Sequence, residues 1–144
     1  MSLDGSYDAD NIFAKIIRGE APCAKVYEDA HVIAFLDLFP QGKGHTLVIS
    51  KSSRARNLLD VGADDLSHLM LGVQKVARGL RKALEPDGIV VTQFNGAPAG
   101  QTVFHLHFHI IPRFEGVALA GHGAAHMADP AELAALAIVI SEQI

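Results

Sequence analysis

The sequence predicts a single α+β domain built from an antiparallel sheet of about five strands, one long helix and one C-terminal helix. Its 144 residues suit one domain of ordinary size and are too few for two. Several short β-branched or aromatic runs are separated by connections too short for helical crossovers, which favours antiparallel pairing. Two longer segments carry helical start signals or helical periodicity. The composition excludes a disordered, fibrous or disulfide-stapled chain, because the 13 glycines show no period, charged residues are an ordinary 19% and there is one cysteine.

The first half of the chain predicts one short helix and three strands. Apolar residues on one face indicate a helix over 11–18, which Gly19 ends. Short β-branched runs then predict strands at 24–27, 32–38 and 46–50, separated by polar or Gly-rich turns. Residues 1–10, before the first helix, are expected to be flexible.

The long helix is predicted over 64–84. Its apolar positions recur at the three-four spacing that places them on one face, toward the core. These positions are Leu66, Leu69, Met70, Val73, Ala77, Leu80 and Leu84. A strand at 89–93, a Gly- and Pro-containing loop at 95–100 and a last strand at 103–111 follow, and Pro112 is expected to end that strand.

The C-terminal helix is predicted over 129–143, with Asp129 as N-cap and Pro130 at the first helical position. Its nearly uncharged body requires apolar contacts on more than one side, within the fold or across an oligomer interface. Between it and the last strand, 113–128 is predicted to be a loop containing glycines and histidines. His122 and His126 lie four residues apart there, but the glycines argue against a helix that would pair them.

The charge and composition limit the kinds of partner that we expect for the protein. A formal net charge of −4 argues against a broad surface for nucleic acid. The start of the chain has no basic and apolar leader, and no run approaches the roughly 18 apolar residues of a membrane helix, so we expect a cytoplasmic protein without a membrane partner. Cys23 is the only cysteine and cannot form an internal disulfide.

The most informative segment is Phe104–Ile111, in which three histidines alternate with apolar residues. On a strand, His105, His107 and His109 would share one face, and the apolar residues would face the core. A solvated strand face seldom carries three successive histidines. Two functional interpretations therefore stay open: the row ligates a metal, or one imidazole is a nucleophile and the others bind an anion.

The neighbouring residues favour an anion over a metal. Glu115 is the only acidic residue close downstream that could complete a metal site. The loop before the strand offers amides, a hydroxyl and backbone N–H groups that can surround a phosphate. These residues are Asn95, Gly96, Gly100, Gln101 and Thr102.

In the histidine row and the loop before it, the sequence resembles the histidine triad (HIT) family of nucleotide-binding hydrolases and transferases. The family's mark is His-φ-His-φ-His-φ-φ, where φ is apolar, and 105–111 fits every position. Segment 11–22 resembles the family's opening segment, segments 35–40 and 44–49 its second and third strands, and segment 95–103 its phosphate loop, in that order. The resemblance covers most of the chain.

The resemblance implies one HIT-like domain that cleaves purine nucleotides at the α-phosphate without a cofactor. His107 would attack phosphorus to give a covalent nucleotidyl-histidine, supported by His105, His109 and His45. The leaving group would be that of a phosphoramidase-like or a dinucleoside polyphosphate hydrolase-like enzyme. The resemblance also implies a homodimer. The implied nucleotide- and phosphate-binding residues are Phe13, Phe35, Asp37, Leu38, Asn95, Gly100, Gln101 and Thr102.

Some positions depart from the family pattern. Many relatives hold a zinc ion through residues that are replaced here by Asn11, Ala14 and Ser53, so we predict no structural zinc. Phe94 replaces an amide residue before Asn95 and cannot donate to phosphate. The third histidine, His109, favours the hydrolase branches, because the uridylyltransferase branch has Gln there.

Two alternatives from other classes stay open. A metal-dependent, cupin-like enzyme would use the histidine row as ligands, although the helix at 64–84 is foreign to an all-β fold. A non-catalytic nucleotide-binding module would keep Asp37 and the loop, and would bind a nucleoside monophosphate without turnover.

Overall fold

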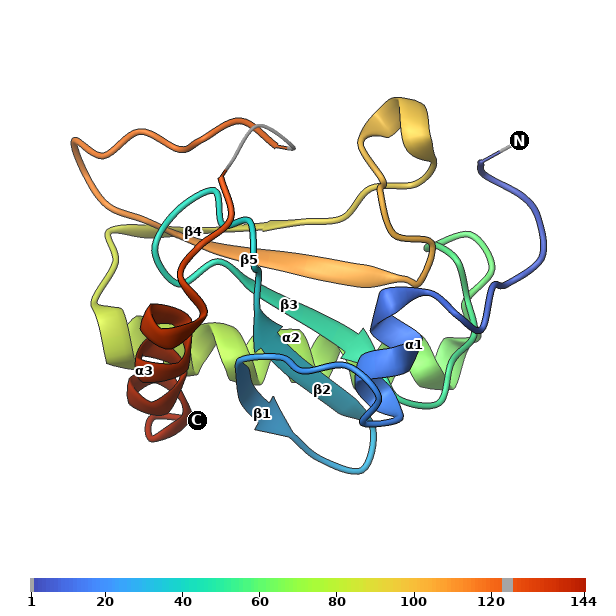
Figure 1. Cartoon of the computed structure of the whole chain (residues 1–144), viewed down its shortest axis with the longest axis horizontal. Coiled ribbons are helices and arrows are strands. Elements are labelled where there is room, and N and C mark those ends of the chain that lie inside the picture. The colour runs from blue at the N-terminus through green and yellow to red at the C-terminus, as the bar shows by residue number, and fades with distance from the viewer. Residues whose placement is uncertain (1, 123–125) are drawn as a thin grey trace.

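The predicted α+β domain is confirmed by the structure, a computed structural model that describes residues 2–122 and 126–144. A five-stranded, wholly antiparallel sheet has the order β1-β2-β3-β5-β4 (Figure 1). In chain order the elements are α1 (Ile12–Ile17), β1 (Lys25–Glu28), β2 (Val32–Leu36), β3 (Thr46–Ser50), α2 (Ala63–Leu84), β4 (Gly88–Thr92), the 3₁₀ turn Ala97–Ala99, β5 (His107–Arg113) and α3 (Pro130–Ser141). Residues 123–125 of the predicted 113–128 loop lie outside the described residues.

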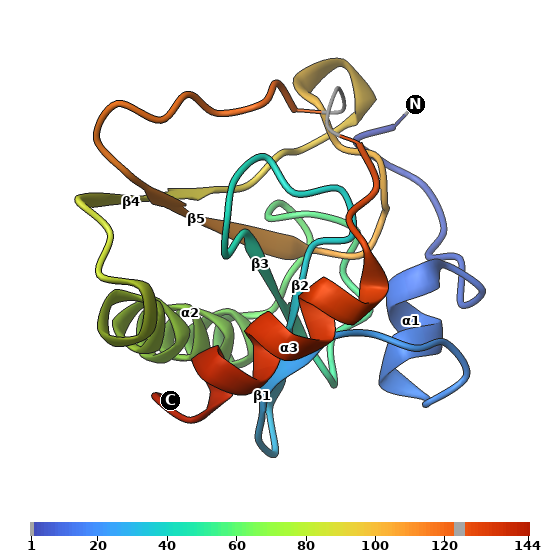
Figure 2. The same cartoon turned by 60° about the vertical axis from the view of Figure 1, so that its left-hand side comes forward.

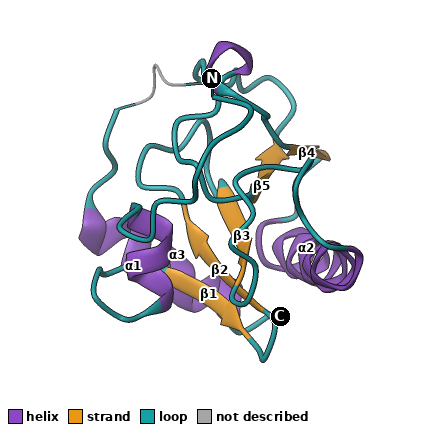
Figure 3. Ribbon diagram, turned by 90° about the vertical axis from the view of Figure 1, so that its right-hand side faces the viewer, coloured by secondary structure: helices purple, strands orange, loops and turns teal. Residues whose placement is uncertain are grey.

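Helices cover both faces of the sheet. Helices α2 and α3 pack on one face, where alternate residues of β2, β3 and β5 join their core cluster (Figure 2). Helix α1 packs on the opposite face, and Phe13 and Ile16 contact the intervening residues of β2 and β3 there. Strands β2 and β3 are consequently buried along their whole length. Figure 3 shows the twisted sheet edge-on between α1 and α2.

The last strand differs from the prediction at both ends. It was expected over 103–111, but β5 begins at His107 and continues through Pro112 to Arg113. The backbone N–H of Leu106 donates to the carbonyl of Ala55 instead of to β3, so His105 lies in a bent segment before the strand. Proline is tolerated at 112 because β3 pairs no further than Ile110 and leaves that side of β5 free.

Smaller corrections concern strand and helix boundaries. Strand β2 ends at Leu36 rather than residue 38, because the Asp37 carboxylate accepts the N–H of Phe39 and turns the chain. In α2, Met70 was expected in the core but is exposed, whereas Val76 is fully buried. The strand predicted at 24–27 lies one residue later in the structure, and the strand predicted at 89–93 lies one residue earlier.

The helix ends follow the expected capping chemistry. The Asn11 side chain accepts the N–H groups of Phe13 and Ala14, and Asp129 accepts the N–H of Ala131 at the start of α3. Helix α3 buries one side only, and Ile138 and Val139 on its other side are exposed. Among the described residues, no helix combines the length and the apolar character needed to cross a membrane.

The chain start makes specific contacts. The backbone carbonyls of Ser2, Leu3 and Ser6 accept hydrogen bonds from the side chains of Arg56 and Asn57. The flexibility expected for residues 1–10 stays a prediction.

Close packing of α2 on β2 depends on Gly72. A Cβ at this position would lie 2.8 Å from a methyl group of Val32, which is fully buried and rigid at χ1. We predict that Gly72→Ala destabilises the protein by about 1 kcal/mol, because overpacking of ~1–3 kcal/mol exceeds the helix-propensity gain of up to ~1 kcal/mol. Urea unfolding measures this. Gly88→Ala is the control, since a Cβ there meets nothing within 4 Å; equal stability of the two variants would contradict the prediction.

Candidate active site

The register between β3 and β5 places two histidines on the α1 side of the sheet. His107 pairs with Ile49 and His109 with Leu47, and both imidazoles are buried. His45 precedes β3, where Gly44 at a φ of 83° turns the chain into the strand. The fold therefore brings His45, His107 and His109 together. The fourth predicted histidine, His105, joins them from the bend before β5.

The hydrogen bond of His107 defines which nitrogen can react. Its Nδ1 lies 2.7 Å from the backbone oxygen of His105. A carbonyl oxygen only accepts, so we assign the proton to Nδ1 and the lone pair to Nε2. The ring of Phe13 packs edge-on against His107 with a centroid separation of 4.9 Å. The imidazole is thereby held in one orientation with a nucleophilic Nε2.

A second hydrogen-bond chain fixes His45 and His109. The backbone N–H of Gln41 donates to Nδ1 of His45 at 3.0 Å, which places the His45 proton on Nε2. That Nε2 lies 2.9 Å from Nδ1 of His109 and donates to it. Neutral His109 must then carry its proton on Nε2, an atom that is buried and has no partner among the described residues. A ligand that supplied an acceptor here would satisfy this N–H.

Asp37 lies beside the same chain. One carboxylate oxygen accepts the N–H of Phe39, and the other lies 3.5 Å from Nε2 of His45. Burial raises the pKa of Asp37 above its usual value. Ligand atoms of Asp37, His45 and His109 lie within 4.8 Å of one another, a donor set that suits a divalent metal. A metal there would have to break the His45–His109 hydrogen bond, and the absence of zinc stays a prediction.

Burial keeps these imidazoles neutral. Loss of solvation lowers the pKa of His45, His105 and His107 from 6.5 to about 4. It lowers the pKa of His109 to about 3, where the neighbouring imidazoles add to the effect. A neutral imidazole is the form that can attack phosphorus.

The predicted phosphate loop is braced by its own side chains. The Oε1 atom of Gln101 accepts the N–H of Gly96, and its Nε2 donates to the carbonyls of Arg56 and Val103. The Oδ1 atom of Asn95 accepts from the backbone N–H of Leu58. Both amides therefore maintain the loop's shape, and their expected contacts with a phosphate or leaving group stay predictions.

The remaining predicted residues occupy different surroundings. Phe35 is buried against Phe13 beneath the histidines, with ring centroids 5.4 Å apart. Leu38 is exposed. Thr102 is also exposed and lines a hollow with Ser2 and Asn11, on the side where the N-terminal residues lie.

Two residues that were not predicted as site residues lie against the histidines. Nε2 of His122 is 2.6 Å from the carbonyl oxygen of Gly100, and its ring packs on Phe94 and edge-on against His109. Tyr7 lies at the other end, with its hydroxyl 2.6 Å from Nδ1 of His105. The sequence carried no spacing signal for either contact, because both residues come from irregular segments far from 105–109.

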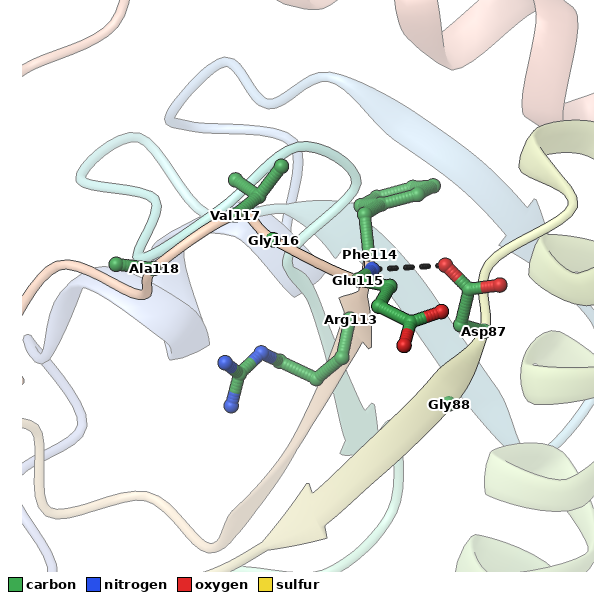
Figure 4. Close-up of a pocket in the computed structure, with 8 residues that line it drawn as sticks. All are labelled: Asp87, Gly88, Arg113, Phe114, Glu115, Gly116, Val117 and Ala118. Atoms are coloured by element: carbon green, nitrogen blue, oxygen red, sulfur yellow. Dashed lines mark hydrogen bonds between the residues drawn. The ribbon is translucent and has the colours of Figure 1, made fainter.

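A second surface hollow lies away from these groups, at the ends of β4 and β5 (Figure 4). The Asp87 carboxylate there accepts the N–H of Glu115, and Arg113 extends away from both acidic side chains. Arg113 lies six residues along β5 from His107, roughly 20 Å at strand spacing. This hollow is separate from the histidine site.

Comparison with known proteins identifies the family. The HIT domain model matches residues 18–116, more than half of the chain. The chain belongs to the histidine triad (HIT) family. An uncharacterised HIT-like protein of Methanocaldococcus jannaschii is 50% identical over 105 residues, covering 73% of this chain and 80% of that protein. An adenosine 5'-monophosphoramidase of Schizosaccharomyces pombe is 39% identical over 134 residues, 92% of this chain and 97% of that enzyme.

Solved HIT structures share the fold. A HIT-like protein from Bartonella henselae, described as involved in cell-cycle regulation and crystallised with an unknown ligand, has a TM-score of 0.88 and 48% identity, over 96% of this chain and all of that one. A zinc-bound histidine triad protein from Mycobacterium smegmatis has a TM-score of 0.79 and 30% identity, over 93% and 92% of the two chains. Membership of the HIT family supports the general class that the sequence predicted, nucleotide hydrolases and transferases.

Neutral buried histidines make stability depend on pH. In the unfolded chain these imidazoles titrate near 6.5, whereas in the folded protein they titrate at about 4 or about 3. Between these values the unfolded chain binds more protons, so stability falls as pH falls. We predict that the free energy of unfolding in urea decreases from pH 7 to pH 5. Each such histidine adds a slope of up to about 1.4 kcal/mol per pH unit.

The variant His109→Asn tests the source of this slope. The Asn oxygen can accept from Nε2 of His45 but does not titrate, so the variant should lose stability less steeply over the same range. An unfolding free energy that is equal at pH 5 and pH 7 in the wild type would contradict the assignment.

Proposed function

We propose that this protein cleaves purine nucleotides at the α-phosphate, with His107 as the nucleophile. The observation that carries the proposal is the hydrogen bond from Nδ1 of His107 to the His105 carbonyl, which leaves Nε2 unprotonated. In the first step Nε2 bonds to the α-phosphorus, and the bond from phosphorus to the leaving group breaks. In the second step water displaces the imidazole and releases the nucleoside monophosphate.

The other histidines supply protons and positive character. The buried Nε2–H of His109 can donate to a phosphate oxygen or to the departing group. Because an arriving phosphate favours the protonated forms of the imidazoles that it touches, binding raises their low pKa values toward neutrality. An imidazolium formed in this way gives its proton to the leaving group. No metal is needed in these steps, since positioning and charge neutralisation dominate phosphoryl transfer.

Asp37 and the residues around it are proposed to bind the nucleoside. The resemblance assigns Asp37 to the ribose, and its carboxylate lies beside His45, next to the histidine cluster. Phe13, Phe35 and Leu38 are assigned to the base, and Asn95, Gly100, Gln101 and Thr102 to the phosphate and leaving group.

Among leaving groups we favour an amine, as in a nucleoside phosphoramidate. The support is the adenosine 5'-monophosphoramidase of S. pombe, which aligns over nearly its whole length with this chain. A protonated amine leaves readily once an acid is in reach, and His109 offers that acid.

The alternatives are less well supported. A cupin-like metalloenzyme is an all-β protein, whereas this chain has an open sheet covered by the 22-residue helix α2. A binding module without catalysis would have no need for a nucleophile with a fixed lone pair. Measuring turnover in the wild type and in His107→Asn distinguishes such a module from an enzyme.

Replacing the nucleophile tests the reaction. We predict that His107→Asn lowers kcat for adenosine phosphoramidate on the order of 10⁴-fold or more, as expected for removal of a nucleophile. Rapid quenching of the wild-type reaction should yield a peptide that contains His107 and carries a nucleoside monophosphate. A diadenosine polyphosphate is tested in parallel, and a faster wild-type turnover of it would overturn the preference for an amine.

The matched control for this variant is His68→Asn, which makes the same substitution at an exposed histidine of α2. Its activity should equal that of the wild type. Comparable turnover by His107→Asn and His68→Asn would remove His107 as the nucleophile.

We also propose that the protein forms a homodimer through β4. This strand is at the edge of the sheet, and its neighbouring residues Val90 and Val91 are 36% and 46% exposed. An unpaired edge of this kind can pair with a second copy of itself around a twofold axis.

A charge on the edge strand tests the dimer. We predict that Val91→Lys converts the dimer to a monomer in sedimentation velocity, because a lysine on an edge strand opposes pairing between strands. Ile138→Lys places the same charge on the exposed side of α3. Dissociation by Ile138→Lys alone would move the interface to α3 and contradict the proposal.

A further inference from the structure

Residues 2–7 form a segment that we call the N-terminal strap, which precedes both α1 and the part matched by the HIT model. It runs beside the phosphate loop (Figures 1 and 2). The guanidinium of Arg56 donates to the carbonyls of Ser2 and Ser6, each at 3.0 Å. The backbone N–H of Ala97, in the loop itself, donates to the Ser2 hydroxyl at 2.9 Å. The strap is thus attached along its length to segments around the site.

The strap ends at Tyr7, which reaches the first histidine of the triad. The Tyr7 hydroxyl lies 2.6 Å from Nδ1 of His105, and the two rings meet edge-on with centroids 5.7 Å apart. The guanidinium carbon of Arg54 lies 5.2 Å from the centroid of the Tyr7 ring. The tyrosine is therefore held on its ring as well as at its hydroxyl.

Because His105 is buried, its ring depends on the hydrogen bond with the Tyr7 hydroxyl. The residue is 1% exposed, so water cannot replace a lost partner of Nδ1. A backbone contact with Ser50 favours a proton on the imidazole. If the hydroxyl donates to Nδ1, the ring proton is placed on Nε2 and both ring nitrogens can be satisfied. This is the tautomer that we assign.

The position of His105 is less constrained by the sheet than those of its neighbours. His107 and His109 are fixed by the β3–β5 ladder, but residue 105 lies in the bend before β5. The backbone oxygen of this residue accepts the Nδ1–H of His107. Its placement therefore decides whether His107 presents an unprotonated Nε2.

We propose that Tyr7 is a positioning residue for the reaction: its hydroxyl holds the His105 ring, and through it the carbonyl that orients His107. The proposal rests on the function proposed above for His107. It assigns a role in catalysis to the strap, a segment outside the matched HIT domain.

The variant Tyr7→Phe removes only the hydroxyl, and Tyr27→Phe is its matched control. Tyr27, the other tyrosine of the chain, also donates its hydroxyl to a partner, the Asp29 carboxylate, but it lies on β1. With adenosine phosphoramidate, we expect Tyr7→Phe to lower kcat about tenfold, a typical cost of losing a group that orients a reactive residue. KM should stay within about twofold, since the hydroxyl is not proposed to touch substrate.

A second measurement does not depend on turnover. Nitrogen-15 NMR of the imidazoles reports which ring nitrogen of His105 carries the proton. We expect an Nε2-protonated His105 in all three proteins, with the Nδ1 resonance shifted only in Tyr7→Phe, because only this variant loses the hydrogen bond that Nδ1 accepts. Thermal unfolding verifies that each variant is folded at the assay temperature.

The outcomes separate this proposal from the proposed function. Loss of activity in His107→Asn together with unchanged kcat in Tyr7→Phe would overturn the role of Tyr7 and leave the nucleophile in place. A proton on Nδ1 of His105 in the wild type would overturn it as well, as would an equal fall in kcat for Tyr27→Phe. Activity that survives in His107→Asn would instead overturn the proposed function.

Discussion

The register of β5 against β3 is the constraint on which the site depends. Pairing of Ile49 with His107 and of Leu47 with His109 directs both imidazoles to the face that α1 covers. A shift by one residue would direct Phe108 there and the imidazoles into the core between the sheet and α2. On that face Phe13 of α1 covers His107, and Phe94 and His122 cover His109, so the same register also buries the histidines and lowers their pKa values. The β3–β5 register thus determines both where the imidazoles of His107 and His109 lie and that they are neutral.

Buried imidazoles are stable only if their nitrogens have partners, and here the backbone supplies most of them. The N–H of Gln41 and the carbonyl of His105 fix the tautomers of His45 and His107. His45 then fixes His109, whose buried Nε2–H has no partner among the described residues, at a cost of about 1–3 kcal/mol for a buried donor. A fold retains such a group where an acceptor arrives with a ligand. In the proposed reaction that acceptor is the phosphate or the departing group.

The sequence predicted what periodicity and local chemistry determine. Strand β3 has its predicted bounds, the caps at Asn11 and Asp129 are as expected, and the alternation within β5 is confirmed from His107 onward. The start of β5 was wrong, because the long-range bond from Leu106 to Ala55 decides it and no local signal carries that bond. The same holds for Tyr7 and His122, whose contacts with the site depend on how irregular segments fold back.

These two contacts connect segments outside the matched domain to the histidine cluster. The HIT model spans residues 18–116, so it contains the three triad histidines, but Tyr7 and His122 lie on either side of it. Tyr7 contacts the first triad histidine, and His122 packs against the last. The M. jannaschii relative aligns over 73% of this chain, so similarity of that extent supports the shared core and the general class of reaction. The surroundings of His105 and His109 depend in addition on Tyr7 and His122, which lie outside the residues that the HIT model matches.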